Sequence, residues 1–335
     1  MEDPANARAP AWMRVLKSPW LKVALAVGVI YALVAFNRIG LDSFAGLSQT
    51  WGWLVLAFAL MLPTYVIVSY RFWRVLRNQG IHVSFRLALR WTMVGSFFDI
   101  AMPSNSGGDV IKAGYIVRHV GAGLRTKGVM AVAFDRVLGL LGLFLLAGVT
   151  SIAGWNVVRA MPGSTQVMLF VALVSFGSLV FFRIAGARRL YTNEGFRKTV
   201  EGLPAGARLY SIIGSFNSLR EKPGDFFAVL GLSMLNHVFW CAALLCITVA
   251  FGQSVGPVLG LTVFPLAIFS NAFGFAGGFG VGTAAFDLIF SKLLDVQVGA
   301  AIGLTFQMLS GLSRLTGLPF YLASGSTRSD EFDSA

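Results

Sequence analysis

Long apolar runs, separated by short polar stretches, dominate the chain. They lie at residues 20–37, 51–70, 86–102, 128–150, 166–184, 226–250, 257–276, 280–294 and 299–323. A helix needs about 20 apolar residues to cross the hydrocarbon core of a bilayer, and several runs reach that length. The pattern therefore predicts an all-α polytopic membrane protein with about six to eight transmembrane helices, because a membrane barrel would show short alternating segments instead.

The composition supports a membrane class. Hydrophobic residues make up 56% of the chain and charged residues only 13%, whereas soluble domains carry about a quarter charged residues. The net charge is +12, but the basic residues lie between apolar runs and therefore indicate topology and contact with anionic lipid headgroups rather than nucleic acid. Cys241 and Cys246 share one apolar run and are expected to be packed small residues.

The basic residues also predict where the chain turns. Segment 103–127 carries four Lys or Arg residues and 185–225 carries seven, whereas 38–50 and 151–165 carry one each. Cytoplasmic loops hold such an excess. A full crossing by 86–102 would leave both basic segments outside, so we expect this run to enter the membrane and turn back. Both termini are then cytoplasmic.

The predicted turn has the sequence PSNSGG at residues 103–108. Pro103 ends the descending helix, Asn105 offers hydrogen-bonding groups, and Gly107 and Gly108 allow a tight turn. Asp109 suits the first turn of an exiting helix. Non-helical backbone at membrane depth is tolerated only inside protein or beside a watery cavity, so this re-entrant tip is a candidate binding site.

A second interruption, SNAFGFAGGFGVGT, lies at residues 270–283 and includes Gly277 and Gly278. Two broken segments at comparable places in two halves are typical of a transporter with an inverted repeat and a central site. The alternative is eight or nine ordinary spans, in which the glycines allow close helix packing.

We expect three parts along the chain. Residues 1–19 form a cytoplasmic N-terminal segment, 20–323 a membrane domain with a basic loop at about 185–225, and 324–335 a short acidic tail. The first apolar run lacks a small-residue cleavage site and is expected to be a retained span.

Several ionisable residues interrupt apolar runs, where they are costly and usually face a cavity or a partner. Arg136 could hold a phosphate bidentately, or form an interfacial pair with Asp135. Arg314 lies too deep to reach water and needs an anion. Asp99 could cap the tip or pair with Lys112, which could also be an ordinary cytoplasmic charge.

Other polar groups give weaker signals. The amides of Gly107 and Gly108, near a helix N-terminus, form a natural anion cradle. His237 is expected chiefly to hydrogen-bond between helices, although it could act with Asp99 and Asp287 as a proton or pairing group. The three histidines form no metal pattern, and no catalytic constellation or cofactor motif is present.

Four motifs give the chain a family resemblance: PSNSGGDVIKAGYI, AFDRVLGLLGLFLL, GGFGVGTAAFDLIF and LSRLTGLPFYLASG. With these motifs the sequence resembles the lysylphosphatidylglycerol synthase transmembrane region, or flippase-like, family over most of its length. The family's acidic, basic and glycine positions correspond to Gly107, Gly108, Asp109, Lys112, Asp135, Arg136 and Arg314. Where the family often has a glutamate after its Gly-Gly-x-Gly-Val element, this chain has Thr283, with Asp287 one turn further on.

The resemblance implies a multi-pass protein of the bacterial cytoplasmic (inner) membrane. Some relatives add a soluble domain that transfers an aminoacyl group from tRNA to a phospholipid. The longest polar stretch here, at about 185–225, is too short for such a domain. The chain would therefore correspond to the lipid-translocating part.

The leading hypothesis is a flippase for an anionic or phosphate-headed lipid, such as an aminoacylated phospholipid or a polyprenyl-phosphate-linked lipid. The headgroup would contact Asn105, Gly107, Gly108, Asp109, Lys112, Asp135, Arg136, Gly277, Gly278 and Arg314. The alternatives are a membrane enzyme acting on a lipid-linked phosphate through Asp99 or Asp109, and a non-catalytic scaffold for envelope synthesis. The expected partner is a phospholipid or isoprenoid lipid, with a homo-oligomer or an envelope-synthesis enzyme as further options; no metal, cofactor or nucleic acid is expected.

Overall fold

The computed structural model describes residues 28, 31, 44–101, 107–185, 193–195, 223–273 and 278–326. In its first half these residues form α3 (Leu47–Asn78), α4 (Phe85–Ala101), α5 (Gly107–His119), α6 (Arg125–Ala153), the short α7 (Trp155–Val158) and α8 (Ser164–Ala185). The second half contains α12 (Pro223–Ala250), α13 (Pro257–Ser270), α14 (Val281–Leu293), α15 (Gly299–Arg314) and α16 (Leu318–Ser326). The predicted all-α membrane class is confirmed.

Within the described part of the chain, three helical segments are long and apolar enough to cross a membrane: Leu47–Asn78, Ala122–Ala153 and Pro223–Ala250. The faces that these and neighbouring helices leave uncovered are also apolar, as shown by the exposed Leu173 and Phe176 on α8. This is expected of side chains that contact lipid. The predicted first span at 20–37 and most of the basic loop at 185–225 lie outside the described residues.

Helices α4 and α5 form an antiparallel hairpin. The rings of Trp91 and His119 lie 5.5 Å apart at its open end, and the Asp99 carboxylate accepts the Gly108 N–H at 2.8 Å near its tip. A Cβ atom on Gly108 would lie 2.3 Å from the Gly95 carbonyl oxygen, so the two arms touch only because residue 108 is glycine. Helices α4 and α5 are therefore antiparallel on either side of the predicted tip, whose residues 102–106, including Asn105, lie outside the described residues.

Helices α13 and α14 form a second antiparallel hairpin. Phe264 and Phe290 stack with ring centroids 5.2 Å apart in its middle, and Asn271 lies beside Gly278 near its tip. With 14 and 13 residues, the arms measure about 20 Å each, which is short of the ~30 Å hydrocarbon core of a bilayer. Gly277 lies outside the described residues.

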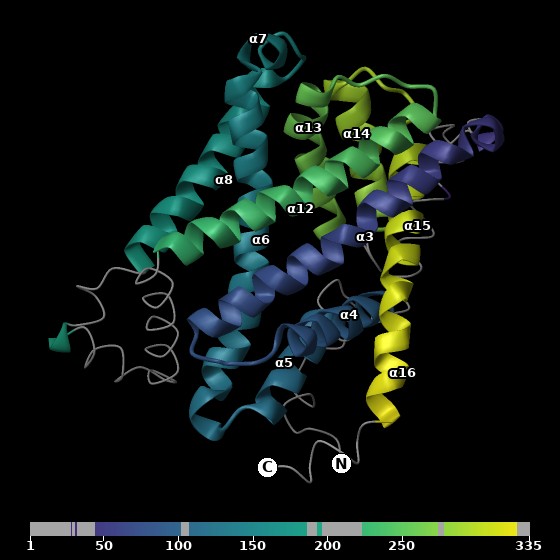
Figure 1. The fold of residues 1–335 in the computed structure, drawn as a ribbon. Helices are drawn as coiled ribbons and strands as arrows, with labels where there is room; N and C mark the ends of the chain where they lie inside the picture. The colour runs from purple at the N-terminus through teal and green to yellow at the C-terminus, as the bar shows by residue number, and fades with distance from the viewer. Residues whose placement is uncertain are drawn as a thin grey trace, which may run out of the picture.

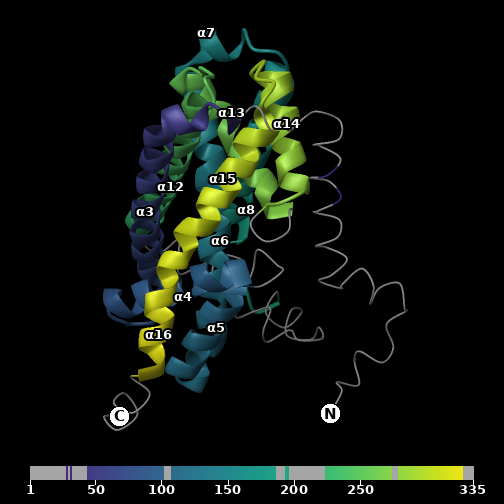
Figure 2. The same cartoon turned by 90° about the vertical axis from the view of Figure 1, so that its right-hand side faces the viewer.

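The last predicted span, 299–323, corresponds to α15, a 3-10 turn at Leu315–Gly317 and α16. Figure 2 shows these elements as one long rod that extends along the height of the described fold. The turn lies against the first hairpin, since a Cβ atom on Gly317 would be 2.1 Å from the Met93 carbonyl oxygen of α4.

The two halves repeat each other in opposite directions. Helices α3 and α12 cross as an antiparallel pair (Figure 1), with Thr50 donating to the Ala250 carbonyl at one end and Arg74 paired with Asp225 at the other. Within the first half α3 contacts α4, α4 contacts α5 and α5 contacts α6, and α12, α13, α14 and α15 repeat this order in the second half. Between the halves, α6 contacts α12 and α13, and α15 correspondingly contacts α3 and α4. This exchange is the arrangement of an inverted repeat. It places the two hairpins at opposite ends of the molecule (Figures 1 and 2).

Candidate functional site

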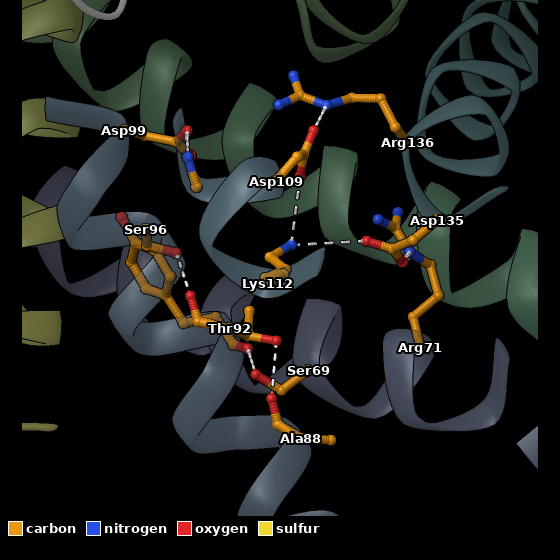
Figure 3. Close-up of polar contacts among 12 residues, drawn as sticks. Ser69, Arg71, Ala88, Thr92, Ser96, Asp99, Asp109, Lys112, Asp135 and Arg136 are labelled. Carbon is orange, nitrogen blue, oxygen red and sulfur yellow. Dashed lines mark hydrogen bonds and ion pairs between the residues drawn. The ribbon is translucent and has the colours of Figure 1, made fainter. Parts of the chain in front are cut away.

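Five charged side chains from three helices form a chain of alternating sign beside the first hairpin (Figure 3). Arg71 comes from α3, Asp109 and Lys112 from α5, and Asp135 and Arg136 from α6. The Arg71 Nε atom lies 2.8 Å from Asp135 Oδ1, and the Arg136 Nε atom lies 2.6 Å from Asp109 Oδ2. Lys112 lies between the two pairs and joins them.

The inner end of the chain is buried. The side chains of Arg71 and Asp135 are 6% and 5% exposed, and Arg71 Nη1 also donates to Ser233 Oγ of α12 at 3.1 Å. A Cβ atom on Gly139 would lie 2.9 Å from Arg71 Nη1, so this glycine makes room for the guanidinium. A buried pair with these additional bonds connects α3, α6 and α12 and serves a structural role.

Lys112 is shared between two carboxylates. Its Nζ atom lies 3.7 Å from Asp109 Oδ1 and 3.9 Å from Asp135 Oδ2, both longer than an N–H···O hydrogen bond. The ammonium group also lies 5.2 Å from the centre of the Phe72 ring. Lys112 can therefore approach either carboxylate with a small rotation of its own side chain.

The outer end of the chain is accessible. The side chain of Arg136 is 41% exposed and that of Asp109 is 24% exposed. Guanidinium groups bind carboxylate and phosphate with the same fork of donors. An anion of this kind can therefore replace Asp109 as the partner of Arg136.

The tip of the hairpin adds a third carboxylate and a fourth cation. Asp99 accepts the Gly108 N–H, and it interacts electrostatically with Arg314 of α15 as well as with Lys112 and Arg136. Next to Arg314, Ser313 is hydrogen-bonded to Tyr65 of α3 at 2.8 Å. The cluster has four cations, three carboxylates and a net charge of +1: Arg71, Lys112, Arg136 and Arg314 with Asp99, Asp109 and Asp135.

The structure brings most of the sequence-predicted site residues together but separates others from them. The first group comprises Asp99, Gly107, Gly108, Asp109, Lys112, Asp135, Arg136 and Arg314. His237 Nε2 donates to the Gly139 carbonyl at 3.1 Å, which is the interhelical bond expected from sequence. Gly278 and Asp287 belong to the second hairpin, where the backbone of Asp287 lies against Gly299 of α15.

Sequence reasoning missed Arg71 and Gln307. Arg71 lies just beyond the predicted apolar run at 51–70, but α3 continues past it to Asn78 and its side chain is buried. The sequence indicates this burial only weakly, because Arg71 shares a helical face with the apolar Phe72, Val75 and Leu76. Gln307 had no signal beyond being a polar residue in an apolar run.

These features together define an all-α multi-pass membrane protein with an inverted repeat and a charge cluster beside one of two opposed hairpins. Residues 20–315 match the family described as lysylphosphatidylglycerol synthase TM region. The chain belongs to this family, which relates it to membrane lipid synthesis and flippase function. No curated protein and no solved structure matches the chain.

Proposed function

We propose that the protein is a flippase of the bacterial cytoplasmic membrane, without enzymatic activity of its own, that moves an anionic or phosphate-headed lipid between leaflets. The observation that supports this proposal most is the charge cluster beside the first hairpin. It combines a buried pair with an accessible Arg136 and an excess of one positive charge. Such groups are costly in a membrane and usually serve a substrate pathway.

In this proposal the headgroup phosphate displaces Asp109 from Arg136. Asp109 then moves closer to Lys112, which is only 3.7 Å away, so its charge remains balanced. Backbone N–H groups at the start of α5 and the guanidinium of Arg314 supply further donors to the phosphate. The lipid tails stay in the bilayer beside the apolar outer faces of the helices.

Transfer between leaflets would use both hairpins. Gln307 of α15 contacts the tip of the second hairpin, while Arg314 of the same helix lies near the first. Seven residues of helix correspond to about 10 Å along the axis. Rocking of the two inverted halves would expose a headgroup held by the first hairpin to each leaflet in turn.

The charge distribution supports a cytoplasmic entry for the first hairpin. Arg118, Arg125 and Lys127 lie at its open end, where α5 leads into α6. Cytoplasmic segments carry this excess of Lys and Arg, so the second hairpin would enter from the opposite side. A membrane lipid is the only partner that this proposal requires.

The test is transfer of a fluorescent short-chain phosphatidylglycerol in proteoliposomes, with the outer leaflet quenched by a membrane-impermeant reductant. We expect the parent protein to transfer the lipid and Arg136→Gln to lose most of this activity. Arg118→Gln, which changes an exposed residue of the same hairpin, is the matched control and should behave like the parent. Absence of transfer by the parent across a panel of anionic lipids would refute the proposal.

A further inference from the structure

The tip of the second hairpin is closed by one glutamine. Gln307 of α15 is 1% exposed. Its Nε2 atom donates to Asn271 Oδ1 at 2.9 Å and to the Gly278 carbonyl at 3.1 Å, and its Oε1 atom accepts the Thr283 hydroxyl at 2.7 Å. Three of the four hydrogen bonds available to a glutamine amide are therefore made within the protein.

The described backbone at this tip lies close to the Asn271 and Gln307 side-chain amides. Gly278 and Gly280 have φ angles of 119° and 80°, values that residues with a side chain rarely adopt. A Cβ atom would lie 2.2 Å from Asn271 Oδ1 at Gly278 and 2.6 Å from it at Gly282. The glycines therefore let the Asn271 and Gln307 side-chain amides lie directly against the backbone at residues 278–282.

The two halves differ in chemistry at the corresponding place. In the first half, α5 and α6 meet through Lys112 and Asp135. In the second half, the neutral side chains of Thr283 on α14 and Gln307 on α15 are hydrogen-bonded, and the acid Asp287 of α14 is buried beside Gly299 of α15. A neutral pair whose bonds are already made, one turn from a carboxylate, cannot balance a phosphate charge, whereas the five-residue charge chain of the first half has a net charge of +1.

We infer that Gln307 is a positioning residue that fastens the end of α13, the tip and the start of α14 to α15, so that the second hairpin moves as one body. The inference rests on the proposed function and assigns different tasks to the two hairpins. The first hairpin binds the headgroup. The second carries the movement and does not contact the headgroup charge.

The experiment compares Gln307→Met, which keeps the side-chain length but removes all three bonds, with Gln297→Met at an exposed position as the matched control. Binding of phosphatidylglycerol, transfer in proteoliposomes and amide hydrogen exchange are measured on each. We expect binding within about twofold of the parent and transfer reduced about tenfold, because buried groups are left unpaired. The Ala284 amide, which donates to the Gly280 carbonyl at 3.0 Å, should exchange faster.

Three results would overturn the inference: a loss of binding as large as that of Arg136→Gln, unchanged transfer, or unchanged exchange at Ala284. A parent protein without transfer would refute the proposed function, but the exchange measurement would still decide whether Gln307 fastens the tip. Should Gln307→Met fail to fold, Thr283→Val removes one bond with little change in shape. The same pattern of effects, smaller in size, is then expected.

Discussion

Breaking the buried pair of Arg71 and Asp135 should reveal how the fold tolerates charge in its interior. Removing one partner of a buried ion pair costs about 3–5 kcal/mol, because the remaining charge is left without compensation. Arg71→Met leaves Asp135 with a second cation, since Lys112 is 3.9 Å away. We therefore expect this variant to lose about 3 kcal/mol of unfolding free energy. Asp135→Asn leaves two buried cations with one carboxylate fewer, and we expect it to lose about 5 kcal/mol of unfolding free energy.

The double variant Arg71→Met/Asp135→Asn removes one charge of each sign. It should therefore be more stable than the sum of the single variants implies, by about 2 kcal/mol. Arg74→Met is the matched control one turn along α3, because its partner Asp225 is 31% exposed and such pairs contribute about 0.2–1 kcal/mol.

Unfolding can be followed with a thiol-reactive fluorophore, because Cys241 and Cys246 are both buried and free. The fluorophore reacts as the helices separate, and titration with denaturing detergent then yields the free energy of unfolding for each variant. Additive effects in the double variant would refute the reasoning. So would a larger loss for Arg71→Met than for Asp135→Asn, because the role given to Lys112 would then be wrong.

Two further predictions concern the first hairpin. Gly108→Ala should abolish lipid transfer, because its Cβ atom would lie 2.3 Å from the Gly95 backbone oxygen, whereas Gly114→Ala meets nothing within 4 Å and should transfer lipid normally. Asp109→Asn should increase the affinity for phosphatidylglycerol about tenfold, measured by equilibrium binding, because it removes the charged competitor for Arg136. An unchanged or weaker affinity would contradict the proposed exchange of partners.

The first hairpin could be predicted because its signals are local. Pro103 disfavours a continuing helix whatever surrounds it, and Asp109 suits the first turn of the next helix, which begins at Gly107. The count of basic residues in 103–127 is also independent of the fold. The second hairpin had the same glycine signal, and its antiparallel arms follow from it. Asp135 and Arg136 were detectable because charge in an apolar run is conspicuous.

The positions of Arg71 and Gln307 could not be predicted in the same way. Arg71 follows an apolar run and has two more arginines close behind it, so it resembles a cytoplasmic loop residue. Its burial depends on Asp135, which is 64 positions away, and on the space that Gly139 leaves in α6. Gln307 bonds to Asn271, 36 positions earlier, across the second tip.

The sequence by itself determined the membrane class, the approximate limits of the described apolar helices and the two glycine-rich interruptions between them. Apolar length, charge asymmetry and glycine conformation are properties of short segments, and they act before any tertiary contact exists. Only the tertiary structure decided which charges meet, that Lys112 lies between two carboxylates, and that Gln307 bonds across the second tip. Those features depend on distances between atoms far apart in the chain, and such distances arise only when the helices pack.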